Sequence, residues 1–559
     1  MPPHDAGAER VASSAHALLL LQVSVRLVTF ALNQVLVRTT SPAVFGAANV
    51  QLELVLATVL TLAREGVRAV VMRRRGAGMD AGVHNLALLP AAAGGGIAAA
   101  VGGAYAWWAP AALRAHGAAF SLSVALYCMG AFLELLAEPL HTRALFLPAY
   151  VRIRMAMEAS AVVVRAVVAV ALLEPSGMRW LARVLPFAAS APARALVAFG
   201  LSRAAYGAAV FLVGAVAVAR ATSVRDVFAA YMPQWSTRGD AETYALLRVT
   251  SAQAVLKLVL TEGDKIAVVH YTTLEEQGGY ALASNYGSLV ARTFFQPVEE
   301  TTLIRLLLRL HILLGLFLVT FAPPLAQPFL YVAAGPRWAL GSASTPATPS
   351  TASSILAWYC YYVPVMGING VVEAFVQSVL PPRTLAYYSR VLIASSVLFA
   401  ALLALGHAAY ASPTYGAALE RGTGAGAECV LVVANIISLG VRAAVSWSLT
   451  ASYFARRVPP HAALRADTLS LRACSPSLAV WAAFAAAFAA VRTRRVVVAD
   501  VRGVRGVVDA IFDTATPLAR LVAVTAVATL GTFLVCLWTE RGTAVAGWRM
   551  VRGRGTREG

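Results

Sequence analysis

Long apolar stretches recur along almost the whole chain and are separated by short polar segments. A helix that spans a bilayer needs about 20 mostly apolar residues, and about fourteen stretches meet that requirement. The stretch at 249–271 is the least apolar of them, and the pattern as a whole predicts an all-α polytopic membrane protein. The stretches lie at residues 15–37, 43–63, 85–107, 117–137, 147–173, 194–219, 249–271, 279–298, 305–333, 352–379, 384–407, 427–454, 475–491 and 517–538.

The sequence also carries signs of an internal repeat. Residues 14–17 (SAHA) resemble 251–254 (SAQA), and the Ala-Tyr at 149–150 recurs at 386–387, so both matches are 237 residues apart. This offset maps each expected helix onto the sixth helix after it, and transporter folds are commonly built from repeated bundles. We therefore expect two pseudo-symmetric six-helix lobes plus two C-terminal helices.

This organisation divides the chain into segments. They are a cytosolic N-terminus (1–14), an N-lobe (15–219), a cytosolic linker (220–248), a C-lobe (249–454), a cytosolic loop (455–474), the last two helices (475–538) and a basic cytosolic tail (539–559).

Composition supports the membrane interpretation. Hydrophobic residues make up 59% of the chain and charged residues 13%, with a mean hydropathy of +0.69, which is far more apolar than a soluble domain. A net charge of +19 could indicate nucleic-acid binding. However, the basic residues stand in short runs between apolar stretches, where lipid head groups and the positive-inside bias account for them. We expect no nucleic-acid partner.

Three groups of arginines set the expected orientation. If successive stretches cross the membrane in alternating directions, all three groups lie on the same side of the membrane. The positive-inside bias predicts that this side is cytosolic and that both termini lie there. Residues 492–495 disagree, because their arginines follow the thirteenth stretch on the predicted lumenal side. The three groups are Arg68 with Arg73, Arg74 and Arg75; Arg456 with Arg457; and Arg549, Arg552, Arg554 and Arg557.

Cofactor chemistry has little support in the sequence. The five cysteines are scattered, without a CxxC or a histidine at metal spacing, so neither a disulfide framework nor a zinc site is expected. Neither Lys257 nor Lys265 follows a phosphate-binding GxxxxGK[ST] loop, which argues against ATP hydrolysis. We expect no catalytic residue, no metal and no cofactor.

Polar residues recur on one face of several apolar stretches. The stretch at 15–37 carries them at i, i+4, i+7 and i+11, and those at 279–298 and 427–454 carry them at i, i+3, i+7 and i+11. A charge in hydrocarbon is costly and normally faces a partner or a water-filled cavity. A shared central cavity would account for all the stripes. The substrate-cavity candidates are Arg26, Asn33, Glu53, Arg64, Asn285, Arg292, Asn369, Glu373, Asn435 and Arg442.

The alternative is that these residues hold helices together. Ion pairs such as Arg26 with Glu53, or Arg442 with Glu373, would satisfy them without a substrate. The choice of arginine suits phosphate oxygens, although an arginine-rich genome would give the same bias. Both interpretations stay open on the sequence alone.

Four helix-break candidates stand together in the stretch at 249–271: Glu262, Gly263, Asp264 and Lys265. A glycine amid charges at membrane depth indicates a broken helix facing a cavity, and the end of a segment near the interface would give the same pattern. A break would make Gly263 less tolerant of a side chain than a glycine such as Gly214.

These and other motifs resemble those of a known family. The strongest are LTEGDK at 260–265, GSLVAR at 287–292 and QPVEE at 296–300. Supporting motifs are LLQ at 20–22 with Arg26, LARE at 62–65, ELLAEP at 134–139, ING at 368–370 with Glu373, and AN at 434–435 with Gly440 and Arg442. In these motifs the chain resembles the Rft family, endoplasmic-reticulum proteins of the oligosaccharide-translocation pathway, over nearly its whole length.

The resemblance implies a fold like that of the multidrug/oligosaccharidyl-lipid/polysaccharide exporters, with two six-helix lobes and two C-terminal helices. It implies a role in bringing a dolichol-pyrophosphate-linked heptasaccharide from the cytosolic to the lumenal leaflet for protein N-glycosylation. The implied partners are this lipid, the lipids of the endoplasmic-reticulum membrane and other proteins of the glycosylation pathway. One departure stands out: after Glu300 only residues 301–305 precede the ninth helix, where the family has a longer cytosolic segment.

Several functions compete. A flippase would pass the glycan and pyrophosphate through the cavity, whereas a non-transporting accessory or scaffold protein would share every feature except a need for the arginines. A dolichol-dependent glycosyltransferase would need an acidic pair in a large early lumenal loop, and residues 38–42 are too few to hold one. A drug or cation antiporter of the same fold is the remaining alternative.

Overall fold

A computed structural model of the chain describes residues 34–74, 78–234, 241–294, 301–340, 351–379, 382–423, 426–457, 474–492 and 516–541. The described residues are almost entirely helical and include no β-strand. Among them, ten helices are long and apolar enough to cross a membrane. The prediction of an all-α polytopic membrane protein is therefore confirmed.

The chain divides into two compact units, Met1–Lys265 (unit 1) and Ile266–Gly559 (unit 2). The long helix α13 (Ala241–Tyr271) begins in unit 1 and ends in unit 2. The other described elements of unit 1 are α2 (Pro42–Gly46), η1 (Ala47–Leu52), α3 (Glu53–Leu60), η2 (Thr61–Glu65), α4 (Gly66–Arg74), α5 (Ala81–Trp108), α6 (Ala111–Arg114), α7 (Ala118–Leu136), α8 (Glu138–Leu145), α9 (Tyr150–Leu173), α10 (Pro175–Val184), α11 (Ala191–Ala221) and α12 (Val224–Ala229).

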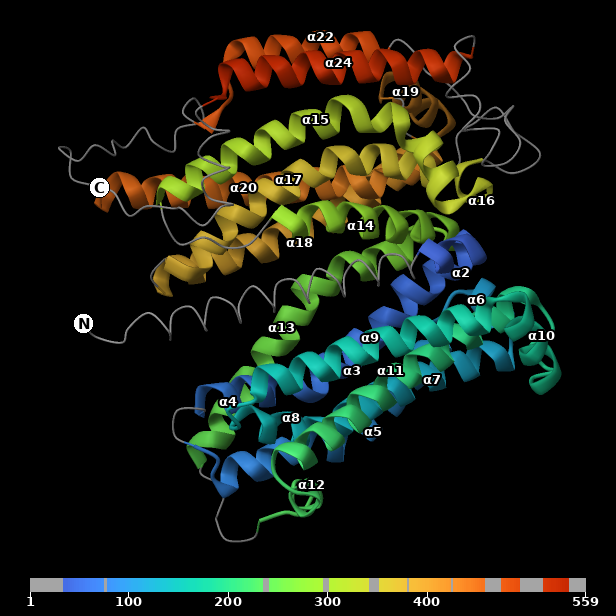
Figure 1. Cartoon of the computed structure of the whole chain (residues 1–559), viewed down its shortest axis with the longest axis vertical. Helices are drawn as coiled ribbons and strands as arrows, with labels where there is room; N and C mark the ends of the chain where they lie inside the picture. The colour runs from blue at the N-terminus through green and yellow to red at the C-terminus, as the bar shows by residue number, and fades with distance from the viewer. Residues whose placement is uncertain are drawn as a thin grey trace, which may run out of the picture. The chain divides into compact units, whose positions relative to one another are not determined.

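Unit 1 is an up-and-down bundle (Figure 1). Helix α7 packs against both α5 and α11, and α9 packs against α11. The short helices α6 and α10 lie at one end of this bundle, and α8 and α12 lie at the other. The elements from α2 to α4 form one continuous span, Pro42–Met72, in which η1 and η2 are π-helical.

Local sequence explains where several of these helices begin. The Asp80 side chain accepts a hydrogen bond from the backbone N–H of Val83 at 2.7 Å and so caps α5. Ser190 caps α11 in the same way through Ala193, at 3.2 Å. Such caps satisfy backbone donors that the first turn of a helix leaves unpaired.

Unit 2 is organised around α17, which packs against α14, α15 and α20, while α18 packs against α20. The C-terminal helices α22 and α24 pack against each other and against α15, through a core that includes Phe321, Phe484 and Leu521. The described elements are α14 (Leu274–Phe294), α15 (Thr301–Ala334), α16 (Pro336–Ala339), α17 (Thr351–Val379), α18 (Pro382–Ala411), α19 (Pro413–Thr423), η4 (Ala427–Cys429), α20 (Val430–Arg457), α22 (Leu478–Arg492) and α24 (Pro517–Thr539).

The two units share an order of packing. In unit 1 the contacting pairs are α5 with α7, α7 with α11, and α9 with α11. In unit 2 they are α15 with α17, α17 with α20, and α18 with α20. In each unit a short helix also lies, in chain order, between the two helices of the last pair. This helix is α10 between α9 and α11 in unit 1, and α19 between α18 and α20 in unit 2.

Some expected spans differ from the ten. The stretches at 249–271 and 279–298 correspond to α13 and α14, which are helical but are not among the ten apolar spans. The stretch at 475–491 corresponds to the shorter α22, and most of the first stretch, 15–37, lies outside the described residues. Helix α15 begins at Thr301, four residues before the expected start of the ninth stretch.

Candidate functional site

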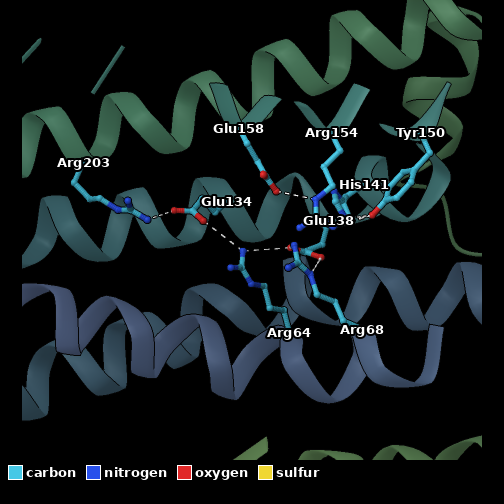
Figure 2. Close-up of polar contacts among 9 residues, drawn as sticks. All are labelled: Arg64, Arg68, Glu134, Glu138, His141, Tyr150, Arg154, Glu158 and Arg203. Atoms are coloured by element: carbon cyan, nitrogen blue, oxygen red, sulfur yellow. Dashed lines mark hydrogen bonds and ion pairs between the residues drawn. The ribbon is translucent and has the colours of Figure 1, made fainter. Parts of the chain in front are cut away.

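Unit 1 holds a row of five alternating charges between its helices (Figure 2). Because α11, α7, η2, α8 and α4 each supply one side chain, the row ties together elements that are far apart in the sequence. The carboxylates are almost inaccessible, with Glu134 6% and Glu138 3% exposed. In order, this unit 1 charge row consists of Arg203, Glu134, Arg64, Glu138 and Arg68.

The contacts along the row are unequal. Arg68 donates to both carboxylate oxygens of Glu138, from Nε at 2.9 Å and from Nη2 at 2.5 Å, and Arg203 donates to Glu134. Arg64 lies between the two carboxylates, and its Nη1 donates at 3.3 Å to Glu134 and at 3.4 Å to Glu138. Arg64 is thus held by the longest contacts, and its buried Nε has no partner among the described atoms.

Because the two carboxylates are buried, each of them needs a cationic partner. An isolated carboxylate in an apolar interior is strongly destabilised, and pairing with a hydrogen-bonding cation offsets that cost. Arg203 gains a further contact, because its guanidinium carbon lies 4.3 Å from the centre of the Tyr206 ring. The row therefore stabilises the packing of α7, α8 and α11 on the first described span.

The polar stripes in the sequence do not identify the partners of Arg64, although both partners belong to the ELLAEP motif at 134–139. Glu134 and Glu138 are four residues apart, a spacing that places two side chains on one face of a helix, and they stand in an apolar stretch. Two glutamates at this spacing in an apolar stretch indicate a buried polar site, but they do not indicate which arginine pairs with them. Arg203 was missed in the same way, as a lone arginine within an apolar stretch.

A second ion pair in unit 1 joins α9 to α3. Arg165 Nη2 donates to Glu53 Oε1 at 2.6 Å. The sequence suggested Arg26 as the partner of Glu53, but Arg26 lies outside the described residues, and the described partner is Arg165. Glu53 directly follows the π-helical η1, and Arg64 stands inside η2. Interruptions of this kind are frequent at functional sites.

Unit 2 contains the ion pair that the sequence suggested between Arg442 and Glu373. Arg442 Nη2 lies 3.1 Å from both carboxylate oxygens of Glu373, and Asn369 Nδ2 donates to the same carboxylate at 2.6 Å. Ser446, one turn after Arg442 on α20, donates to the Tyr388 hydroxyl at 2.9 Å. We call these residues the unit 2 cluster; its members come from α17, α18 and α20.

The ion pairs Glu134–Arg203 and Glu373–Arg442 occupy equivalent places in the two units. The partners are 69 residues apart in each pair, and the second pair follows the first by 239 residues at both positions. Each pair joins corresponding helices, α7 to α11 in unit 1 and α17 to α20 in unit 2. This offset is close to the 237 residues found from the sequence motifs.

The remaining cavity candidates are dispersed. Asn435 donates from Nδ2 to the Tyr280 hydroxyl at 3.4 Å, and Asn285 is half-buried on α14. The backbone of Arg292 belongs to α14, but its side chain lies outside the described part, as do Arg26 and Asn33. The described candidates thus fall into two groups within unit 1 and one cluster within unit 2, with Asn285 and Asn435 elsewhere in unit 2.

The expected helix break is absent. Helix α13 runs without interruption from Ala241 to Tyr271, through Glu262, Gly263, Asp264 and Lys265. Glu262 and Lys265 form an i,i+3 ion pair at 2.7 Å, and a glycine inside a helix costs only about 1 kcal/mol relative to alanine. The continuous backbone hydrogen bonds outweigh that cost, so the prediction of a broken helix was wrong.

Comparison with known proteins identifies the family. The family model described as Rft protein matches residues 10–306 and 301–549. A relative from Yarrowia lipolytica, named Man(5)GlcNAc(2)-PP-dolichol translocation protein RFT1, is 30% identical over 499 residues, which cover 79% of this chain and 70% of the relative. A relative of the same name from Mus musculus is 27% identical over 519 residues, covering 83% of this chain and 85% of the relative. Together these matches show that the chain belongs to the Rft family.

Proposed function

We propose that this protein serves the translocation of a dolichol-pyrophosphate-linked oligosaccharide, the heptasaccharide intermediate, from the cytosolic to the lumenal leaflet of the endoplasmic-reticulum membrane. In this role it supports protein N-glycosylation. The observation that carries the proposal is the family match over nearly the whole chain, with relatives named as Man(5)GlcNAc(2)-PP-dolichol translocation proteins. A polytopic helical bundle with charges buried between its helices suits a substrate that joins an apolar tail to a polar head.

The proposed architecture has fourteen spanning helices in two pseudo-symmetric lobes, 15–219 and 249–454, a linker at 220–248 and two further helices within 475–538. The shared packing order of the two units and the repeated ion pair support this arrangement. We place both termini, the loop at 455–474 and the tail at 539–559 in the cytosol, on the positive-inside argument.

The proposed role is transport without chemistry at the substrate. A glycosyltransferase of this kind would need a sizeable early lumenal loop. Residues 34–39 are helical and α2 begins at Pro42, so only Thr40 and Ser41 join the two. Thr40 is itself engaged, since its hydroxyl donates to the Leu36 carbonyl oxygen at 2.7 Å. This connection leaves no room for an acidic active site there, which supports a transport protein rather than an enzyme.

Within this proposal, Arg26, Arg64, Arg292 and Arg442 compensate the pyrophosphate charge, and the neighbouring amides and carboxylates line its path. Arg64 and Arg442 suit this role best among the described residues. Each keeps an unpaired buried Nε, and each side chain is partly accessible, 18% for Arg64 and 25% for Arg442. In the present contacts each guanidinium uses a single terminal nitrogen, and a substrate phosphate that replaces the glutamate oxygens would engage two nitrogens at once.

A second candidate function is a non-transporting accessory or scaffold protein of the dolichol-linked oligosaccharide pathway. One observation favours it: both Arg64 and Arg442 already have carboxylate partners within their own unit. Under this alternative the ion pairs serve only to hold helices together, and the protein acts through another component of the pathway.

Reconstitution distinguishes the two functions. Purified protein is placed in liposomes with a dolichol-pyrophosphate-linked Man5GlcNAc2, and the fraction of glycan reached by an external mannosidase is followed over time. Translocation predicts that the protected fraction becomes accessible only when the protein is present, and more slowly when all four arginines are replaced by glutamine. Equal accessibility in protein-free liposomes, or no acceleration by the wild-type protein, would contradict direct translocation and favour the accessory role.

A further inference from the structure

Helix α10 joins two membrane spans at one end of unit 1. The span Arg152–Leu173 ends two residues before α10 begins at Pro175, and the next span begins at Ala191. Helix α10 packs against both α9 and α11. Helix α10 lies at one end of the unit 1 bundle (Figure 1). Because it is held between the ends of two spans, we expect it near the boundary between hydrocarbon and head groups.

The helix divides its side chains among three faces. Leu181 is fully buried and anchors α10 on the bundle. Trp180 and Val184, one turn apart, are each 52% exposed. Arg179 and Arg183, also one turn apart, are exposed on an adjoining face, and neither forms an ion pair within the described part of the chain.

Aromatic side chains mark the same end of unit 1. Trp107 and Trp108, at the last turn of α5, are 78% and 86% exposed, and Phe187, just after α10, is 48% exposed. Tryptophan is enriched where a protein crosses the head-group region, because its ring is apolar while its N–H still finds a hydrogen-bond partner. These side chains indicate a membrane interface at the level of α10.

We infer that α10 binds the anionic phospholipid head groups of the bilayer that the chain spans. Arg179 and Arg183 contact the lipid phosphates, while Trp180 and Val184 enter the upper acyl region, as in amphipathic helices that lie in an interface. The proposed orientation makes this face lumenal, where positive charge is ordinarily sparse. A specific contact with lipid phosphates accounts for two exposed arginines in that position.

The corresponding helix in unit 2 supplies a matched control. Helix α19 also joins two spans, but it carries Glu420 beside Arg421, so its charged side chains balance. Within α19, from Pro413 to Arg421, only Gly416 is buried, and no large apolar residue anchors the helix as Leu181 anchors α10. We therefore expect α19 to show little preference for anionic lipid.

The test is amide hydrogen exchange of the full-length protein in nanodiscs of phosphatidylcholine alone and of phosphatidylcholine mixed with phosphatidylinositol. Exchange over residues 176–185 should slow in the anionic discs by about fivefold for each arginine that contacts the surface. The variant Arg179→Gln with Arg183→Gln should lose this lipid dependence while keeping the wild-type melting temperature. Arg421→Gln on α19 should leave the lipid dependence of α10 unchanged.

Two outcomes would overturn the inference. One is equal exchange of α10 in both lipid compositions in the wild-type protein, and the other is lipid dependence that persists without the two arginines. A second variant tests the apolar face: Trp180→Glu should speed exchange of α10 in both kinds of disc, and unchanged exchange would contradict insertion of Trp180. None of these readouts depends on translocation.

Discussion

The same ion pair stands in two different settings in units 1 and 2. In unit 1 the Glu134 and Arg203 side chains are each 7% exposed, and further arginines surround the carboxylates. In unit 2 the side chain of Arg442 is 25% and that of Glu373 14% exposed, with an amide as the additional donor. The first setting favours a fixed structural contact, and the second leaves the arginine able to change partner.

Helix packing explains part of this difference. In unit 1 two glycines bring α7 and α11 together: a Cβ on Gly130 would lie 2.7 Å from the Arg203 carbonyl oxygen, and one on Gly207 would lie 2.3 Å from the Gly130 carbonyl oxygen. The positions 239 residues later hold Asn369 and Ser446. Small residues allow close approach of membrane helices. Unit 2 instead places polar side chains beside its ion pair.

The largest effect should follow loss of the shared carboxylate in unit 1. Glu134→Leu leaves Arg203 buried without an anionic partner, which should cost about 3–5 kcal/mol and strongly reduce the amount of folded protein. Size-exclusion profiles and thermal melting in detergent would measure this loss. The double variant Glu134→Leu with Arg203→Leu should recover much of it, because an apolar pair of similar volume is often tolerated. Wild-type stability of the single variant would contradict the structural role of this pair.

A smaller effect should come from exchanging the residues that differ between the units. Gly130→Asn should destabilise unit 1 by about 1–3 kcal/mol, because the new side chain must displace backbone of α11. The reciprocal Asn369→Gly removes one hydrogen bond to Glu373 without a clash and should cost about 1 kcal/mol. Melting temperatures of the two variants should differ in this order. The reverse order would show that α7 and α11 do not depend on close glycine packing.

Breaking the pair in unit 2 should be milder than breaking the pair in unit 1. Arg442→Leu should cost about 1–2 kcal/mol, because Glu373 keeps some access to polar surroundings and its bond from Asn369. Adding Glu373→Leu should restore protein abundance in the membrane fraction. Abundance that stays low in the double variant would indicate that Arg442 stabilises unit 2 through contacts other than the ion pair.

The smallest effects concern two glycines. A Cβ on Gly214 would lie 2.7 Å from Met157 Cε, whereas one on Gly263 would meet no described atom within 4 Å apart from its chain neighbours and the backbone of its own helix. Gly214→Leu should therefore lower stability by about 1–2 kcal/mol, and Gly263→Leu should change it by less than about 0.5 kcal/mol. This order reverses the expectation from a broken helix. Greater damage at Gly263 than at Gly214 would restore a special role for that turn of α13.

The spans could be predicted from the sequence because bilayer thickness imposes a length on each apolar stretch. The stretch at 85–107 corresponds to α5 (Ala81–Trp108), and the stretch at 427–454 corresponds to η4 and α20. The continuity of α13 could not be predicted from residue types alone. The charged residues around Gly263 form a pattern that is typical of a helix break. In the structure, however, Glu262 and Lys265 form an ion pair along the continuous helix.

The charged sites were only partly predictable. Glu373 and Arg442 could be matched because each stands on a polar stripe within an apolar stretch. The partners of Arg64 could not, because hydropathy does not show which helices are neighbours, and Glu134 and Glu138 are 70 and 74 residues away. For the same reason Arg165 could not be predicted as the partner of Glu53, since the two residues are 112 residues apart in the sequence.

The central claim is that the unit 2 cluster serves the substrate whereas the Glu134–Arg203 pair is structural. Translocation by matched double variants tests this claim most directly. Glu134→Leu with Arg203→Leu, and Glu373→Leu with Arg442→Leu, are reconstituted at equal amounts of folded protein with dolichol-pyrophosphate-linked Man5GlcNAc2. In the unit 1 variant Arg64 keeps Glu138 as a carboxylate partner, so this variant should translocate at nearly the wild-type rate. The unit 2 variant should be slower by about tenfold or more, since a hydrogen bond to a charged group contributes roughly 1.5–3 kcal/mol. Equal rates for both variants would contradict a substrate role for the unit 2 cluster and leave both ion pairs as structural contacts.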